Sequence, residues 1–414
     1  MNKKLLLLCV WIVFIVSLTK AQDQEAIKAI RKATNVKSLT DLSKKANDQF
    51  QKEKKAALEM AKSKGWKVKE QQKNRFIELM RLDKAGNPLY YTTLNSDAAI
   101  STRTNTLHRN GVMELNLEGQ TMTGFVWDAG IARITHQEYD GPGGENRYSV
   151  GDTATTTHYH SAHVAGTIIA SGYEPQAKGM APQARGVGFE WNNDKSEVAL
   201  AASEGMLISN HSYGWFTENI PDWYFGAYVS DSRDWDEIMY NAPYYLMIKS
   251  AGNDGQNDHY NASPLDGNSA YDKLAGDATA KNNLVVANAR DAIIQGEELV
   301  SVEINAGSSE GPTDDYRIKP DIAGNGTSLY STFDESNDDY SSISGTSMAS
   351  PNVAGTLLLL QQLYNNEHSN FMKAATLKGL SLHTADEAGP NGPDAVFGYG
   401  LLNARAAANA IRNH

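Results

Sequence analysis

One serine stands where the chain is expected to enter a helix. Ser347 lies in the segment 345–351 (GTSMASP), and an apolar run, 353–360, follows it. At a helix N-terminus the first amide hydrogens lack intrahelical partners and the macrodipole is positive, so negative charge developing on an oxygen is stabilised. We expect Pro351 in the first turn, where no amide hydrogen is needed. A lone serine here would be an ordinary helix cap, but partner residues lie upstream.

Two upstream segments supply those partners. Asp128 ends an apolar strand pattern, 123–127, where an α/β strand delivers functional groups, and His160 opens a helical stretch rich in small residues, 160–167. A hydroxyl needs an imidazole to take its proton, and the imidazole needs a carboxylate to fix its tautomer and stabilise its charged form. We therefore predict Asp128, His160 and Ser347 as orienting acid, base and nucleophile.

These segments, in the order Asp128, His160, Ser347, resemble those of the subtilisin-like serine peptidases, over about residues 118–410. The segment 250–253 (SAGN) resembles the family's oxyanion strand, which implies that the Asn253 side-chain amide donates beside the Ser347 backbone amide. The segment 210–214 resembles the edge that pairs with an extended substrate. The implied substrate-binding residues are Ser212, Tyr213, Gly214, Ala251 and Gly252.

The resemblance implies a serine endopeptidase that cleaves protein or peptide substrates through an acyl-enzyme, with no cofactor for the chemistry. In that mechanism His160 deprotonates Ser347, and loss of the Asn253 donor costs the transition state on the order of 3 kcal/mol. The chain departs from the family at Ala162, where many relatives carry threonine, but this residue is outside the triad. Tyr213 suggests an apolar wall for the specificity pocket, and the preferred side chain stays open.

Other functions compete with this interpretation. His158, His160 and His163 are close enough in sequence to suggest zinc, but we expect His163 to be a structural donor to a backbone group and His158 a loop residue, so we predict no metal site there. An acid-acting serine peptidase would carry glutamate and aspartate where His160 and Asn253 stand. An exported, non-catalytic binding protein on the same fold is the alternative from another class. Calcium at 254–258 is a further option, although no complete ligand spacing occurs.

The first residues have the pattern of an export signal. Residues 1–21 carry Lys3 and Lys4 near their start, continue with a 14-residue apolar stretch, 5–18, and end with small residues around Lys20. The stretch is too short to span a bilayer comfortably, and no second apolar span follows, so we expect a secreted protein with no stable membrane insertion after removal of the signal. Cys9, the sole cysteine, lies within this segment, which leaves no disulfide in the mature chain.

Charge divides the remaining chain into two parts. Residues 22–100 hold 17 Lys+Arg against 10 Asp+Glu, and residues 101–414 hold 18 against 39. The basic residues do not gather with aromatics, so nucleic-acid binding is not favoured. We expect this basic segment to dock on the acidic domain, as the propeptides of secreted subtilisin-like enzymes do, with an attraction that weakens with salt. The chain would then be a zymogen.

The pattern within this segment predicts a small α+β region. Apolar residues spaced by four and seven indicate an amphipathic helix from about Asp41 to Gly65, and strand-like runs at 76–82 and 89–93 flank the turn-rich segment 83–88. We predict a signal peptide over 1–21, a propeptide-like region over 22–105 and a peptidase domain over 106–414. The cut is expected between Ser96 and Gly119, made by the enzyme itself.

The second part alternates strand and helix patterns. Strands are predicted near 123–127, 185–189, 207–210, 246–250 and 284–287, and helices near 347–364, 371–382 and 402–412. This alternation predicts an α/β fold with a mostly parallel sheet and helices on both faces. Asp128 and Asn253 fall at the carboxyl ends of strands, where such folds gather their active groups.

Overall fold

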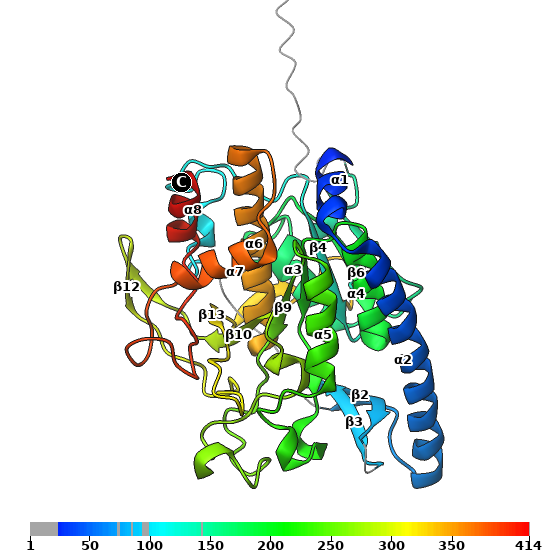
Figure 1. The fold of residues 1–414 in the computed structure, drawn as a ribbon. Helices are drawn as coiled ribbons and strands as arrows, with labels where there is room; N and C mark the ends of the chain where they lie inside the picture. Colours follow the sequence, from blue (N-terminus) through cyan, green and yellow to red (C-terminus); the bar gives the residue numbers. More distant parts are fainter. Residues whose placement is uncertain (1–23, 73–74, 84–85, 93–98, 142–143, 414) are drawn as a thin grey trace, which may run out of the picture.

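The computed structural model describes residues 24–413 except 73–74, 84–85, 93–98 and 142–143 (Figure 1). Its centre is a parallel sheet in the order β13-β10-β9-β7-β4-β6-β5, with helices on both faces, which confirms the predicted fold class. The predicted signal, 1–21, lies outside the described residues. The strands are β4 (Thr123–Asp128), β5 (Tyr148–Val150), β6 (Arg185–Glu190), β7 (Ile208–His211), β9 (Leu246–Ser250), β10 (Leu284–Ala289) and β13 (Ile322–Asn325).

Side chains of the central strands alternate between two apolar cores. Val126, Ile208 and Ile248 pack in one core with the helices α3, α6, α7 and α8, whereas Trp127 and Met247 pack in the other with α4 and α5. Both faces are covered, so strands such as β9 and β10 are buried along their whole length. The helices are α3 (Tyr159–Ile169), α4 (Asp194–Ser203), α5 (Ser230–Asn241), α6 (Thr346–His368), α7 (Ala374–His383) and α8 (Ala404–Arg412).

Helix α6 runs through the first core and carries the predicted nucleophile at its amino end. Of its 23 residues, 18 are buried, including the whole apolar run 357–360. Gly355 lets the helix approach the chain at Met180, because a Cβ added to Gly355 would lie 2.6 Å from the Cβ of Met180. Burial of this kind fixes the helix axially as well as laterally, and thereby fixes its first turn.

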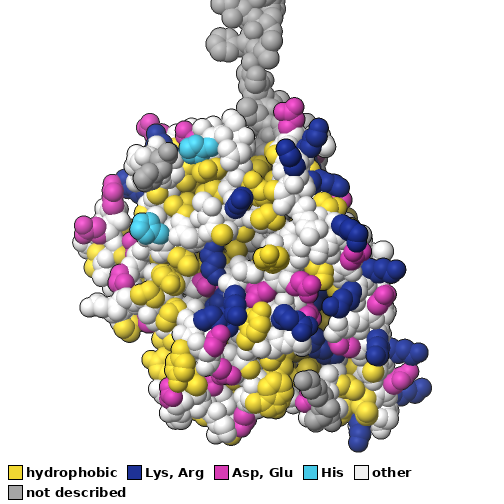
Figure 2. All heavy atoms as spheres, viewed as in Figure 1, with side chains coloured by type: hydrophobic (Ala, Val, Ile, Leu, Met, Phe, Trp, Pro, Cys, Tyr) yellow, Lys and Arg dark blue, Asp and Glu magenta, His cyan; other side chains and the backbone are white. Residues whose placement is uncertain are grey.

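The N-terminal region lies against the second face of the domain. It comprises α1 (Gln24–Ala33), α2 (Val36–Lys64), β1 (Lys69–Gln72), β2 (Arg75–Leu82) and β3 (Pro88–Thr92). Helix α2 lies across α4 and α5, and Figure 2 shows Lys and Arg side chains along the edge that α2 forms. Its apolar residues Leu39, Leu42 and Phe50 join the core that contains α4 and α5. The predicted helix and hairpin are present, although α2 begins earlier than Asp41, at the Asn35 cap.

Strand β3 continues from this region onto the larger domain. It pairs in antiparallel register with the two-residue strand β8 (Gly214–Trp215), so that Tyr91 lies opposite Trp215 and Thr92 opposite Gly214. The four-stranded sheet β1-β2-β3-β8 therefore joins the basic segment to the edge that was predicted to bind substrate. Two small hairpins complete the fold: β11 (Ile293–Gln295) with β12 (Glu298–Ser301), and β14 (Leu329–Thr332) with β15 (Tyr340–Ile343).

No helix among the described residues combines the length and the apolar character needed to cross a bilayer.

A buried histidine ties α3 to the hairpin β14–β15. His163 is fully buried, and its Nε2 lies 2.9 Å from the carbonyl oxygen of Leu329 and 3.1 Å from that of Ser341, as expected for a structural donor. Burial lowers the pKa of His163 to about 3, because the charged imidazolium would lose its hydration. The side chain therefore stays neutral in the folded protein at pH values where an unfolded chain protonates it.

We expect this histidine to make the protein less stable in acid. Between pH about 6.5 and 3 only the unfolded chain takes up the proton, so stability present above 6.5 is lost as pH falls, by about 1.4 kcal/mol per unit for one histidine. His163→Gln, which keeps a donor for the two carbonyls, should flatten the dependence by that amount. Urea unfolding followed by circular dichroism between pH 7.5 and 5 measures it. His383→Gln, which removes an exposed histidine, is the control, and equal slopes for His163→Gln and wild type would contradict the prediction.

Candidate functional site

Asp128 and His160 meet at the carboxyl edge of the sheet. Nδ1 of His160 lies 2.7 Å from Oδ1 of Asp128 and 2.9 Å from Oδ2, and both side chains have no exposed surface. Asp128 ends β4, and its Oδ1 also accepts the Ala129 amide at 2.7 Å. His160 stands in the first turn of α3, whose cap is His158. A carboxylate at Nδ1 keeps the proton on that nitrogen and leaves Nε2 as the acceptor.

Ser347 is held at the same edge by reciprocal hydrogen bonds. Its hydroxyl donates to the carbonyl of Ser212 at 2.9 Å, and the Ser212 hydroxyl donates to the Ser347 carbonyl at 2.6 Å. Trp127 of β4 pairs with His211 of β7, so Asp128 and Ser212 are the next residues of two neighbouring strands. Asp128, which contacts His160, and Ser212, which contacts Ser347, therefore lie at the ends of neighbouring strands at one edge of the sheet.

The position of Pro351 explains one of these bonds. Helix α6 begins at Thr346, so Pro351 lies in the second turn and not in the first, as the sequence had suggested. A proline has no amide hydrogen, and the carbonyl four residues earlier, that of Ser347, thus lacks its helical donor. The Ser212 hydroxyl replaces that donor. The proline in this motif therefore couples the nucleophile turn to the strand edge.

Asn253 lies beside the start of α6. Its Oδ1 accepts the Thr346 amide at 2.8 Å, which orients the side chain and assigns the amide nitrogen to the opposite side. Gly252, with φ of 116°, makes the turn that brings Asn253 there, and a side chain at Gly252 would meet Ser309. An amide nitrogen fixed in this way is a preorganised donor for an oxyanion near Ser347.

Ser347 opens onto a cavity of about 180 Å³. Predicted residues Tyr213, Gly214, Ala251, Gly252 and Asn253 line it, but Ser212 does not, because its side chain and carbonyl face Ser347. The Tyr213 ring mainly faces the core, where its hydroxyl donates to Asp194 at 2.9 Å, so it is less of a wall than expected. The cavity thus adjoins the nucleophile and is bounded by the predicted substrate edge.

Sequence reasoning missed several lining residues. The apolar wall comes from Trp215 and Phe216, and two lysines, Lys249 and Lys273, also line the cavity. Lys249 interrupts an otherwise buried apolar strand, 246–250, and a charge in such a strand was an available signal. Its Nζ donates to the Tyr213 carbonyl and lies 3.8 Å from Oδ1 of Asp277. Burial lowers the pKa of Lys249 and raises that of Asp277 to about 7.

Three neighbouring histidines contact different partners. Nδ1 of His158 accepts the His160 amide at 3.3 Å, Nδ1 of His160 faces Asp128, and Nε2 of His163 faces two carbonyls. Among the described residues, no group of three or more histidine, cysteine or acidic side chains is placed to hold a metal.

The segment 254–258 does not fit calcium either. Nζ of Lys273 lies 2.8 Å from Oδ1 of Asp258 and also donates to the carbonyl of Gly255. Asp254 instead accepts the side-chain amide of Asn257 at 3.1 Å. An ammonium group thus stands where the oxygen atoms of this loop converge, and a divalent cation would be repelled from that position.

Sequence comparisons identify relatives of this chain. The subtilase family matches residues 103–400. Subtilisin BL of Lederbergia lenta is 27% identical over 304 residues, which cover 70% of this chain and 92% of that protein. The PIII-type proteinase of Lactococcus lactis subsp. cremoris (strain SK11) is 30% identical over 139 residues, 30% of this chain. The matched part spans only 7% of the length of the lactococcal proteinase.

Solved structures agree on the fold. Fervidolysin from Fervidobacterium pennivorans superposes with a TM-score of 0.52 at 22% identity, over 75% of this chain and 45% of that one. A variant of the protease domain of PatA superposes with a TM-score of 0.53 at 20% identity, over 72% of this chain and 98% of that one. The family match covers well over half of the chain and contains Asp128, His160, Asn253 and Ser347. The chain belongs to the subtilase family, the subtilisin-like peptidases.

Proposed function

We propose that this protein is a secreted serine endopeptidase, synthesised as a zymogen, that cleaves proteins or peptides through an acyl-enzyme. The observation that carries the proposal is the buried contact of Asp128 with His160 at the strand edge where Ser347 is held. In the proposed reaction Nε2 of His160 takes the Ser347 proton as Oγ attacks the carbonyl carbon. The imidazolium then protonates the leaving amine, and water releases the acyl group by the reverse roles. These residues supply the chemistry without a cofactor.

Asn253 and the Ser347 amide are the proposed oxyanion donors. The tetrahedral intermediate places negative charge on the former carbonyl oxygen, and donors already in position stabilise this charge without reorganisation. The bond from the Thr346 amide to Oδ1 of Asn253 supports the role, because it leaves Nδ2 as the donor. Substrate would lie along Ser212, Tyr213 and Gly214, with Ala251 and Gly252 beside its first side chain.

We propose residues 22–105 as the propeptide and 106–414 as the peptidase. Strand β3 supports an inhibitory role, because it already pairs with Gly214 and Trp215, the edge proposed for substrate. Secretion is proposed from the signal-like residues 1–21, which would be removed, leaving no inserted segment. A non-catalytic binding protein would not need an oriented carboxylate, imidazole and hydroxyl at one edge, which disfavours that alternative.

Labelling by a serine-directed phosphonate tests the activity. The wild-type chain should react at Ser347 and hydrolyse a fluorogenic peptide, whereas Ser347→Ala should do neither, since the nucleophile is lost. Ser344→Ala, an exposed serine three residues earlier, is the matched control and should retain both. Labelling that persists in Ser347→Ala, or a chelator-sensitive activity that resists the phosphonate, would contradict the proposal.

Asn253→Ala should lower kcat by about 10²- to 10³-fold with a small change in KM, because its donor acts mainly on the transition state. Steady-state kinetics on the fluorogenic peptide measures both constants. Asn257→Ala alters the same cavity away from Ser347 and should leave kcat within a few-fold of wild type. A variant of Asn253 that changed only KM would argue for a substrate-binding role instead.

Maturation should depend on the protein's own activity. Ser347→Ala should accumulate as a chain that retains the N-terminal region, while wild type loses it, because Ser347 is the proposed nucleophile for this cut. Mass spectrometry with N-terminal sequencing follows the cut, which we place between Ser96 and Gly119. Processing of Ser347→Ala at the wild-type rate, without added active enzyme, would show that another protease does the work.

A further inference from the structure

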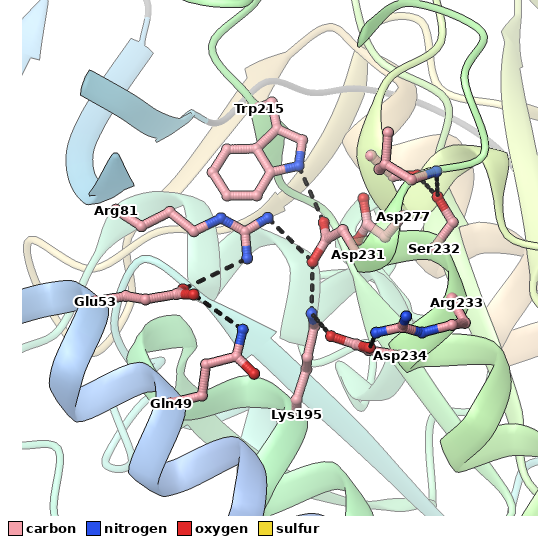
Figure 3. Close-up of polar contacts among 12 residues, drawn as sticks. Gln49, Glu53, Arg81, Lys195, Trp215, Asp231, Ser232, Arg233, Asp234 and Asp277 are labelled. Atoms are coloured by element: carbon pink, nitrogen blue, oxygen red, sulfur yellow. Dashed lines mark hydrogen bonds and ion pairs between the residues drawn. The ribbon is translucent and has the colours of Figure 1, made fainter. Parts of the chain in front are cut away.

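Arg81 of β2 occupies a slot that is built mainly by the larger domain (Figure 3). Its guanidinium carbon lies 4.4 Å from the centroid of the Trp215 ring, and its Nη2 lies 3.3 Å from Oδ1 of Asp231. The indole nitrogen of Trp215 donates to the other oxygen, Oδ2 of Asp231, at 3.1 Å. Tyr224 packs edge-on to Trp215, with ring centroids 6.4 Å apart. An aromatic face above a carboxylate is the arrangement that binds a planar cation.

The slot needs a cation to balance its charge. Asp231 is 2% exposed, and burial acts to raise its pKa, but Lys195 and Arg81 outweigh burial and hold the pKa below its usual range. On the larger domain, Lys195 lies 2.6 Å from Asp231 and 3.4 Å from Asp234, and Arg233 contacts Asp234 at 2.7 Å, so Lys195 is shared between two carboxylates. Removing one partner of a buried ion pair leaves uncompensated charge, which is strongly unfavourable. A slot that loses Arg81 therefore favours another guanidinium.

Trp215 links this slot to the proposed catalytic site. The same residue lines the cavity at Ser347 and pairs with Tyr91 of β3. A strand in the place of β3 runs from Trp215 toward Ser212, because the pairing is antiparallel. In this register, the peptide residue that pairs with Trp215 comes three positions before the peptide residue that would lie opposite Ser212. Since Ser347 contacts Ser212, side chains near the slot belong to the amino-terminal side of the bond to be cut.

We propose that Trp215, Asp231 and Tyr224 form an arginine-binding subsite, which Arg81 fills in the full chain and which basic substrates fill after the N-terminal region departs. The ligand class is a guanidinium on an extended peptide, with its arginine three residues ahead of the residue whose carbonyl is attacked. The peptide part of this assignment rests on the proposed peptidase function, whereas the affinity of the slot for guanidinium does not.

Chemical rescue tests the slot in the full-length chain. Arg81→Ala in a Ser347→Ala background should lower the Tm, and ethylguanidinium should restore it saturably, by about 2 °C or more at ten times its dissociation constant. Ethylammonium, which lacks the planar fork, should restore much less. Two controls should show no saturable response: the Ser347→Ala chain with Arg81 intact, and the same chain with Arg233→Ala. The latter removes an exposed arginine on α5 beside Asp234. Adding Asp231→Asn to Arg81→Ala should abolish the rescue.

Arg81→Ser leaves the same space for the cation and replaces Arg81→Ala if the latter does not fold. Equal responses to the two cations, or a rescue that survives Asp231→Asn, would overturn the assignment of the slot.

Peptide kinetics test the subsite during catalysis. Processed enzyme should cleave a peptide with arginine at the stated position with a kcat/KM at least tenfold above that of its citrulline counterpart, which has the same shape without the charge. Asp231→Asn should remove this difference while cleavage of the citrulline peptide continues. Equal rates for the two peptides on active enzyme would overturn the subsite, whereas absence of all cleavage with intact chemical rescue would count against the peptidase function alone.

Discussion

The burial of helix α6 is the constraint on which the site depends. Eighteen of its residues are buried, and a close approach at Gly355 excludes movement toward Met180. A catalytic serine must be placed within a fraction of an ångström, and a rigid buried helix achieves this better than a loop. The reciprocal bonds of Ser347 with Ser212 then fix the first turn against β7. The packing of the core therefore also determines the geometry of the site in this protein.

Local patterns predicted the parts of the fold that bury continuous apolar surface. The strands at 123–127, 246–250 and 284–287 were found because both faces of a parallel sheet are covered, which leaves no polar alternation in their sequences. The two-residue strand β8 could not be found, since its pairing is set by β3 from another part of the chain. Helix α2 starts before the predicted Asp41 because Asn35 caps it, and the first turn carries little apolar periodicity.

The residues of the candidate site divide in the same way into those that could be predicted from the sequence and those that could not. Asp128 and His160 were predicted from motifs and residue type, and Asn253 from the family resemblance, because few side chains can orient, accept or donate as the proposed reaction requires. Lys249 stood out as a charge in an apolar strand, but neither it nor Lys273 could be assigned to the cavity at Ser347, because their positions follow from tertiary contacts with Asp277 and with the loop at Gly255. Pro351 was assigned to the wrong turn because α6 already begins at Thr346, and its effect could not be foreseen because it involves Ser212, 139 residues away.

The contact between the N-terminal region and the larger domain combines two kinds of interaction with different consequences. Leu39, Leu42 and Phe50 bury apolar surface, which stabilises the contact but does not fix the orientation of the two parts. Two buried carboxylates at this contact, Asp231 with Arg81 and Glu78 with the indole of Trp191, offset much of their attraction by desolvation, and so chiefly set orientation. These carboxylates are shielded from solvent, so salt weakens their attraction to these partners only a little. The docking of the N-terminal region should therefore depend less on salt than the opposite net charges of the two parts suggest.

This balance matters at Trp215, where the N-terminal region and an extended peptide would compete. Strand β3 takes the backbone hydrogen bonds of Gly214 and Trp215, while Arg81, one strand further away, covers the indole face. A peptide that replaces only the strand would leave the buried carboxylate of Asp231 with fewer cations than it has now. The pairing of β3 with the edge and the contact of Arg81 with Asp231 are therefore coupled. The N-terminal region stays bound until both contacts are lost together.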